Sequence, residues 1–385
     1  MGKKLAATGN GRCNLTNVLA TERDYHGTAL PLLTAMLRRF PPESVMRAFE
    51  NIGVMCRVED AGRAYPMSDQ ASSVLDALRL SLQEAGVPEI CDCELTELRR
   101  APGGFRLTAR DGRTASAARA ILATGGLSAP SLGGSESGFR IAAALGHAVE
   151  KPFPSLVQIR TETEPIRALK GIRVQAELAI EVGGRELRRE RGEVLFAEYG
   201  LSGIAAMQLS RIAGQACDEG QPAALRLRTL PLDERDALAL LRRRQTALAS
   251  RPLENFLTGM VNKRLGQTLI KLTASPDSAP GLLARPSSSL DQQQLRLLAR
   301  LLTGWRLKVT GTQGFDQAQV TAGGVRGDQV DPESMRSLLV PGLYLAGELI
   351  DLDGDCGGYN LQWAWASGLL AGECCARSLE GKESD

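Results

Sequence analysis

The stretch LYLAGELIDLDGDCGGYNLQWAWASGLLAG, residues 343–372, decides how the fold of this chain is interpreted. It begins with a short apolar run, which predicts a buried strand that ends at Gly347-Glu348. A loop rich in glycine and aspartate follows, and a long helix is predicted from near Tyr359 to about Leu379. A strand, a glycine loop and a helix N-terminus in this order are the elements with which an α/β protein holds an anionic cofactor.

Two further segments rich in glycine lie near predicted elements. Gly9 to Asn14 stands close to the start of the sequence, and Ala123 to Gly126 follows a predicted buried strand over 119–123. Glycine allows a backbone to approach a flat or phosphorylated ligand closely and to present its N–H groups. Each loop alone could be only a tight turn, but three of them at strand or chain boundaries favour a cofactor site.

The remaining pattern divides the chain into two kinds of structure. Predicted helices and strands alternate before residue 155. The next part is predicted to be mainly antiparallel, with Arg-rich helices, and the α/β pattern of buried strand and glycine loop returns after Gly314. We therefore expect one α/β domain formed by 1–154 and 316–385, and an inserted unit formed by 155–315. The expected helices cover 31–40, 44–52, 72–86, 138–145, 233–249 and 290–302, and the expected strands cover 90–98, 105–109, 119–123, 158–161, 175–182 and 185–189.

The composition of the chain argues against several classes of function. The 46 basic and 44 acidic side chains leave a net charge of +2, and aromatic residues make up 4%, so we expect no nucleic-acid partner. No run approaches about 18 apolar residues and no apolar leader is visible, so we expect no membrane partner and a cytoplasmic location. Two histidines, His26 and His147, and cysteine spacings that fit no zinc pattern predict no metal site. The oligomeric state stays open.

The motifs resemble those of a bacterial family of NAD(P)/FAD-dependent oxidoreductases, which includes aminoacetone-oxidase-like and bile-acid-pathway reductase-like flavoproteins. The resemblance covers essentially the whole chain and implies a glutathione-reductase-type FAD-binding α/β domain with an inserted, mainly antiparallel β unit plus helices. It also implies FAD as cofactor, a small-molecule substrate, and NAD(P)H as a possible electron donor. The matching stretches are residues 4–17, 123–126, 199–203, 321–325 and 344–372.

The resemblance also implies where the cofactor lies. Gly347-Glu348 is similar to the family's contact with the ribityl chain and pyrophosphate, and the strand around Glu94 is similar to the adenine-side strand. The helix start near Tyr359 would face the pyrimidine edge of the flavin, where its N-terminus stabilises negative charge. The implied cofactor-binding residues are Thr8, Gly9, Gly11, Arg12, Cys13, Asn14, Glu94, Leu95, Ala123, Thr124, Gly125, Gly347, Glu348, Gly357, Gly358, Tyr359, Asn360 and Leu361.

One departure from the family concerns the beginning of the sequence. Family members start with a βαβ unit of about 30 residues that carries G-x-G-x-x-G for the pyrophosphate, followed by an acidic residue for the ribose. This sequence has no such unit. We therefore expect an N-terminally shortened chain, with the missing unit encoded upstream of residue 1. Loss of the family's first strand would also leave strand edges unpaired.

The catalytic groups are the least defined part of the prediction. The family often has Thr-His before Tyr199, whereas this chain has Ala197-Glu198, so Tyr199 and Glu198 are the only weak candidates for an acid or base. A capping or surface role is favoured for His147, and no role is assigned to His26. Two functions stay open: a flavin-dependent oxidoreductase, or a flavin-free, non-enzymatic remnant or binding protein.

Overall fold

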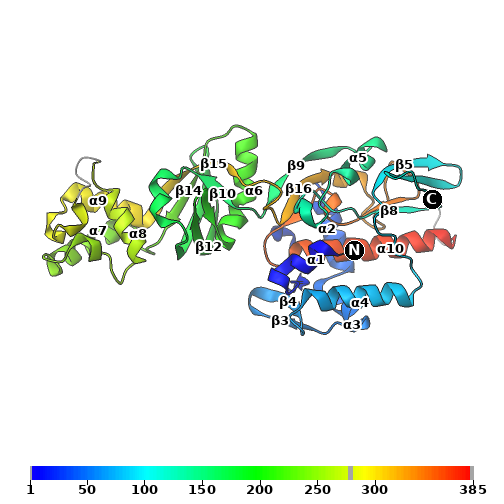
Figure 1. Cartoon of the computed structure of the whole chain (residues 1–385), viewed down its shortest axis with the longest axis horizontal. Helices are drawn as coiled ribbons and strands as arrows, with labels where there is room; N and C mark the ends of the chain where they lie inside the picture. Colours follow the sequence, from blue (N-terminus) through cyan, green and yellow to red (C-terminus); the bar gives the residue numbers. More distant parts are fainter. Residues whose placement is uncertain (1, 276–280, 382–385) are drawn as a thin grey trace. The chain divides into compact units, whose positions relative to one another are not determined.

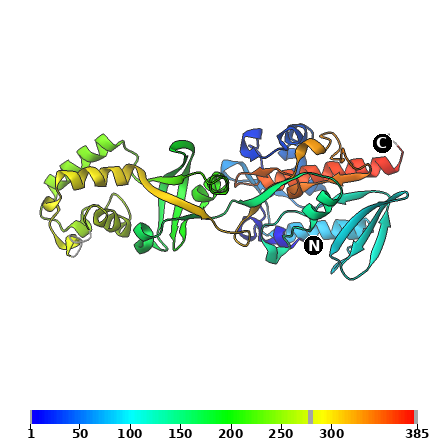
Figure 2. The ribbon, with the colours of Figure 1, turned by 90° about the horizontal axis from the view of Figure 1, so that it is seen from above.

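The computed structural model describes residues 2–275 and 281–381. The chain divides into two compact units, which we call unit 1 (Met1–Ser155 with Phe315–Asp385) and unit 2 (Leu156–Gly314). Both units are drawn in Figure 1 and, from a second direction, in Figure 2. The predicted mixed α/β fold class, with helices and antiparallel strands, is confirmed. Within the described residues, no helix is both long enough and apolar enough to span a bilayer.

Unit 1 is built around one parallel strand pair and the last helix of the chain. Strand β8 (Ala120–Leu122) pairs in parallel with β17 (Leu343–Leu345), and α10 (Tyr359–Leu379) packs beside them. Residues 343–379 therefore form the predicted strand and the predicted helix. Helix α10 turns one apolar stripe to the core because its buried positions recur at helical spacing. These positions are Trp363, Ala366, Leu370, Ala371 and Cys374.

The predicted buried strand over 119–123 needs correction. Strand β8 is shorter, and Ile121 at its centre is 40% exposed. Alternate residues of a strand point to opposite faces, so Leu122 is buried on one face while Ile121 points away from it. An apolar run of this length indicated burial on both faces, which the structure does not provide.

The other helices of unit 1 agree with the sequence, and one strand does not. Helices α2 (Leu30–Arg39), α3 (Pro42–Asn51), α4 (Ala71–Glu84) and α5 (Ser137–Ala144) confirm the predicted helices. The strand predicted over 90–98 is wrong in its first half, because β5 spans only Leu95–Ala101. Asp92 adopts a left-handed φ of 50°, which interrupts an extended backbone.

Short strands complete unit 1. Strands β5, β6 (Gly104–Ala109) and β7 (Thr114–Ala117) form an antiparallel sheet, and β1 (Thr16–Asn17), β4 (Arg63–Pro66) and β3 (Cys56–Val58) form another. Two antiparallel pairs join distant parts of the chain: β9 (Val149–Ser155) with β16 (Val320–Val325), and β2 (Tyr25–His26) with β18 (Asp353–Gly354). A short helix, α1 (Lys3–Ala7), precedes the first glycine segment.

Unit 2 is a closed antiparallel barrel with helices, and the closure itself was not predicted. Gly183 and Gly184, both with positive φ, form the predicted hairpin turn between two of its strands. Figure 1 shows α7, α8 and α9 together at one end of the barrel, and α9 runs directly into β15. The barrel strands, in order, are β10 (Ile159–Thr161), β13 (Gly200–Ser202), β12 (Arg185–Ala197), β11 (Arg173–Val182), β14 (Ala223–Arg228) and β15 (Trp305–Thr312), and the helices are α6 (Ile204–Asp218), α7 (Glu234–Ala247), α8 (Lys263–Lys271) and α9 (Gln292–Gly304).

One of the two histidines is buried in unit 1, which corrects the expected surface position. The expected capping position is confirmed, because the His147 N–H donates to the Ala142 carbonyl at the end of α5, at 3.0 Å. His147 is 4% exposed, and its Nε2 lies 3.0 Å from Ser337 Oγ. The same Oγ accepts the backbone N–H groups of Leu339 and Val340. Burial lowers the pKa of His147, although the Gln329 side chain partly offsets this effect. Burial therefore favours the neutral form of this imidazole over the charged form.

We expect this buried imidazole to make unit 1 less stable in mild acid. The pKa of His147 is lower in the folded than in the unfolded chain, so the unfolded chain binds the proton first. The free energy of unfolding should then fall as the pH drops through about 6.5, the ordinary histidine value. Urea unfolding of wild type and His147→Gln between pH 5 and 7.5 measures this, because the wild-type curve should fall more steeply. Equal slopes for the two proteins would contradict the assignment.

Candidate functional site

The ends of the two parallel strands bring two predicted cofactor segments together. Leu122 of β8 lies opposite Leu345 of β17, and the N–H of Ala346 donates to the Leu122 carbonyl at 3.0 Å. Because the strands are parallel, the segments that follow them, 123–126 and 347–348, leave the sheet at the same edge. The carboxyl ends of parallel strands are where α/β proteins bind ligands.

Glycine shapes both segments at this edge. Gly125 and Gly347 have left-handed φ angles of 73° and 70°, which favour glycine. A Cβ added to Gly125 would meet only Glu348 Oε2, at 3.9 Å, so the backbone there is open. Gly347 is fixed from α10, because its N–H donates to Ser367 Oγ at 2.9 Å and its carbonyl accepts from Trp363 Nε1 at 3.0 Å.

Three donors hold the Glu348 carboxylate. Its Oε1 accepts from the Thr321 N–H at 2.7 Å and from Ser128 Oγ at 3.1 Å, and its Oε2 pairs with Lys4 Nζ at 2.7 Å. The carboxylate is thus oriented and charge-balanced before any ligand arrives. Sequence reasoning missed Lys4, Ser128 and Thr321, although Lys4 and Thr321 lie in stretches that carried the family resemblance.

The start of α10 packs on the first glycine motif. Gly358 caps the helix with a left-handed φ of 102°, and a Cβ added there would lie 2.6 Å from the Thr16 carbonyl oxygen. Asn17 Nδ2 donates to the Gly357 carbonyl at 2.9 Å. Sequence reasoning linked these glycines to close approach by a ligand. The structure shows that Gly358 is required by contact with the chain itself.

An unsatisfied acceptor lies at this junction. Asn14 Oδ1 is buried and has no hydrogen-bond partner in the described part of the chain, and it is 2.8 Å from the position of a Cβ on Gly358. The first N–H groups of a helix lack partners within the helix. One acceptor, Asn14 Oδ1, beside the backbone N–H donors of the α10 start complements a ligand edge in which one N–H group lies between two carbonyl groups. The pyrimidine edge of a flavin has this arrangement.

The side chains of the first turn of α10 serve the protein rather than a ligand. Asn360 bonds both backbone groups of Gly354, at 2.8 Å and 2.7 Å. The Tyr359 ring packs edge-on against the Tyr25 ring, with 5.9 Å between the ring centroids, and Leu361 packs against an apolar cluster. The helix therefore offers its backbone N–H groups to any ligand.

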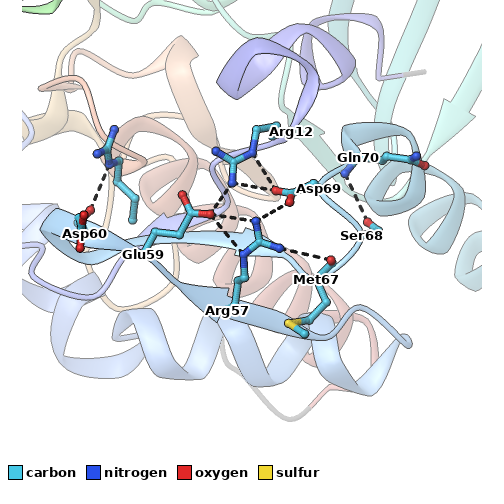
Figure 3. A network of polar contacts seen from close by, with 9 residues as sticks. Arg12, Arg57, Glu59, Asp60, Met67, Ser68, Asp69 and Gln70 are labelled. Atoms are coloured by element: carbon cyan, nitrogen blue, oxygen red, sulfur yellow. Dashed lines mark hydrogen bonds and ion pairs between the residues drawn. The ribbon is translucent and has the colours of Figure 1, made fainter.

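Arg12 belongs to a network of four charged side chains, drawn in Figure 3. Its guanidinium pairs with Asp69 and Glu59, and it lies 4.0 Å over the centre of the Tyr65 ring. Arg57 pairs with the same two carboxylates. Hydrogen bonds from the two arginines lower the pKa of both acids. Arg12 thus links the first motif to the β3–β4 hairpin and the turn that follows it, because its guanidinium donates to Glu59 and Asp69.

Other predicted residues of the first motif also make contacts within the chain or shape its backbone. Thr8 Oγ1 donates to the Leu5 carbonyl at 2.7 Å. Cys13 is fully buried, and this burial raises its pKa to about 11, so its sulfur stays protonated. Gly9 and Gly11 adopt left-handed φ angles of 57° and 83°, which allow the tight path between Thr8 and Cys13.

Glu94 and Leu95 are not joined to these segments by any hydrogen bond or strand pairing among the described residues. Glu94 pairs with Arg110 at 2.7 Å, and Leu95 lies in β5. Glu198 and Tyr199 lie in unit 2, where an ion pair with Lys170 lowers the pKa of Glu198. The exposed Glu198 lacks the environment of a tuned general acid. The described residues also contain no group of three or more potential metal ligands.

Comparison with protein families matches residues 1–374 to the HI0933-like protein Rossmann domain. A 3-dehydro-bile acid Δ(4,6)-reductase of Clostridium scindens is 37% identical over 379 residues, which are 98% of this chain and 90% of that protein. A ribosomal RNA dihydrouridine synthase of Escherichia coli is 30% identical over 386 residues, 100% of this chain and 90% of that protein.

Solved structures resemble the chain more distantly. A flavocytochrome c3 fumarate reductase in an open conformation has 15% identity and a TM-score of 0.39, and covers 94% of this chain and 70% of its own. An E. coli quinol fumarate reductase FrdA variant has 14% identity and a TM-score of 0.46, and covers 99% of this chain and 64% of its own.

Proposed function

We propose a function whose premise is the family: the chain belongs to the HI0933-like Rossmann-domain family, whose members are FAD-dependent. In this proposal the chain is an FAD-dependent reductase that takes electrons from NAD(P)H. Its substrate is a small molecule with a C=C bond conjugated to a carbonyl group. The observation that carries the proposal is the buried, unsatisfied Asn14 Oδ1 at the start of α10, in the same unit as the paired strands β8 and β17.

The chemistry of two relatives supports the choice of substrate class. The bile-acid relative is a Δ(4,6)-reductase of a 3-dehydro bile acid, and the ribosomal RNA relative makes dihydrouridine. Both reactions saturate a C=C bond that is conjugated to a carbonyl group. We favour a small molecule over RNA because the net charge is only +2 and aromatic residues are few.

Named residues would hold the cofactor. Glu348, fixed by its three donors, would accept from ribityl hydroxyls, and the open backbone at Gly125 would lie beside the chain of the cofactor. Asn14 Oδ1 would accept from the flavin N3–H, and the α10 N-terminus would stabilise negative charge on the pyrimidine ring. When bound, FAD supplies two-electron transfer between the nicotinamide and the substrate.

The test begins with cofactor binding. Purified chain is titrated with FAD and followed by flavin fluorescence, alongside the variants Asn14→Leu and Asn51→Leu. We expect Asn14→Leu to bind about tenfold more weakly, because one hydrogen bond of roughly 1.4 kcal/mol is lost. Asn51 is exposed at the end of α3, so its replacement should leave the affinity unchanged. Absence of FAD binding by the wild type would favour the flavin-free alternative.

Turnover then separates the substrates. FAD-loaded protein is mixed anaerobically with NADH or NADPH, and afterwards with a steroid enone or with a ribosomal RNA fragment that contains uridine. Oxidation of the reduced flavin by the enone supports the proposal. Oxidation by the RNA alone would move the substrate to the nucleic-acid class and overturn the small-molecule part.

A further inference from the structure

We propose that His26, held by Asp355, is the general acid that protonates the substrate during reduction. This inference rests on the proposed reductase function and names a catalytic residue for it. Saturating a conjugated C=C bond needs a hydride at one carbon and a proton at the other, so a group with an exchangeable proton must lie at the site. Histidine is the side chain that usually fills this role near neutral pH.

Strand pairing places His26 beside the loop that leads into α10. In the β2–β18 pair His26 lies opposite Asp353, and the Asp355 N–H donates to the Asp24 carbonyl at 2.8 Å. Only Cys356, Gly357 and Gly358 separate Asp355 from the first residue of the helix. The imidazole is therefore anchored to the segment whose far end forms the proposed flavin contact.

The ion pair fixes the orientation of the imidazole. His26 Nε2 lies 3.1 Å from Asp355 Oδ1, and the two side chains are 30% and 12% exposed. A carboxylate bonded to one ring nitrogen holds the proton there and leaves the other nitrogen as the reactive one. His26 Nδ1 has no hydrogen-bond partner among residues 2–275 and 281–381. This nitrogen is free to carry a proton to a substrate and to regain one from water.

Other donors near this loop are poorly suited to the role. The Tyr25 hydroxyl is buried and donates to the Tyr359 carbonyl. Burial raises the pKa of Tyr25, Tyr359 and Cys356, so these groups hold their protons more tightly than usual. The second histidine of the chain, His147, is buried and bonded to Ser337. Both histidines of the sequence lie in the described part of the chain, and of these two His26 is the partly exposed one.

The step balances as follows. The hydride from the reduced cofactor forms a C–H bond at the carbon remote from the carbonyl, and the π pair of the C=C bond moves to the carbon beside the carbonyl. That carbon then forms a C–H bond with the proton that the imidazolium form of His26 carries on Nδ1. The Nδ1–H bond breaks, and the imidazole is left neutral with its remaining proton on Nε2. The substrate gains two electrons, the cofactor loses two, and the neutral imidazole takes its next proton from water.

Separate measurement of the two half-reactions tests the role. In stopped-flow experiments with FAD-loaded protein, His26→Gln should leave flavin reduction by NAD(P)H within about twofold of wild type. Flavin reoxidation by the enone should slow by about 100-fold, the range for loss of a general acid. Asp355→Asn should slow the same step less, and His147→Gln should change neither. Unchanged reoxidation in His26→Gln would overturn the inference while leaving the reductase function intact.

A second readout needs no cofactor. Because the sequence has two histidines, ¹⁵N-histidine labelling gives two ring systems, which His26→Gln and His147→Gln assign. We expect neutral His26 to carry its proton on Nε2 in the wild type, and to lose this preference in Asp355→Asn. A proton on Nδ1 would overturn the arrangement. If the wild type reduces no conjugated bond, the proposed function fails, and the general-acid role fails with it.

Discussion

Replacing Trp363 by alanine is expected to lower the free energy of unfolding of unit 1 by about 3–5 kcal/mol, the usual cost of removing a buried tryptophan. Trp363 is 2% exposed and lies in the stripe with which α10 faces the core. Its indole also donates to the Gly347 carbonyl, so the Gly347-Glu348 segment should lose order at the same time. Urea unfolding, followed by circular dichroism, gives the free energy.

Two further variants separate packing from the hydrogen bond. Trp363→Phe keeps an aromatic ring but leaves the Gly347 carbonyl without its donor, and a loss of about 1–3 kcal/mol is expected. Leu379→Ala, at the exposed end of the same helix, should change stability by less than about 0.5 kcal/mol. A Trp363→Ala protein as stable as Leu379→Ala would show that α10 does not carry the core of unit 1.

Gly358→Ala is expected to cost about 2 kcal/mol or more of stability and to weaken FAD binding. A left-handed φ of 102° strains any residue with a Cβ, and this Cβ would lie 2.6 Å from the Thr16 carbonyl oxygen. The start of α10 would therefore have to move away from the first motif. Thermal unfolding and flavin titration measure the two effects.

The same helix offers a matched control. Gly372 is an exposed helical glycine of α10 with nothing within 4 Å of an added Cβ. Gly372→Ala should therefore raise stability by about 0.5–1 kcal/mol, the difference in helix propensity. Equal effects of the two substitutions would refute the claim that Gly358 is a packing requirement.

Local signals explain why most elements of unit 1 could be predicted. Helix α10 has a glycine cap, a mainly apolar buried stripe and no internal proline, so its bounds follow from nearby residues. The exposure of Ile121 depends instead on which segments reach the faces of β8. Closure of the unit 2 barrel depends on the pairing of β10 with β15, whose residues are about 150 apart in the sequence. No local pattern contains such information.

The sequence indicated which segments belong to the candidate site, but not which side chains are paired there. The sequence indicated that glycine loops around Gly9, Gly125 and Gly347 serve one site, and the structure brings Gly125 and Gly347 to one sheet edge. The sequence could not indicate that Arg12 pairs with Asp69, or that Lys4 pairs with Glu348. His26 received no role because its partner, Asp355, is 329 residues away. Such roles are set by tertiary neighbours.

The division of unit 1 into two chain segments has a consequence for synthesis on the ribosome. Residues 1–155 emerge first, but β17 and α10, which complete their core, emerge last. At about 5–20 residues per second, the roughly 190 residues between residue 155 and β17 take on the order of 10–40 s to translate. The apolar core of unit 2 comes from its own continuous segment, so the barrel can form during this interval. The nascent N-terminal segment meanwhile exposes the apolar surface that α10 later covers, which makes it a natural client for a chaperone.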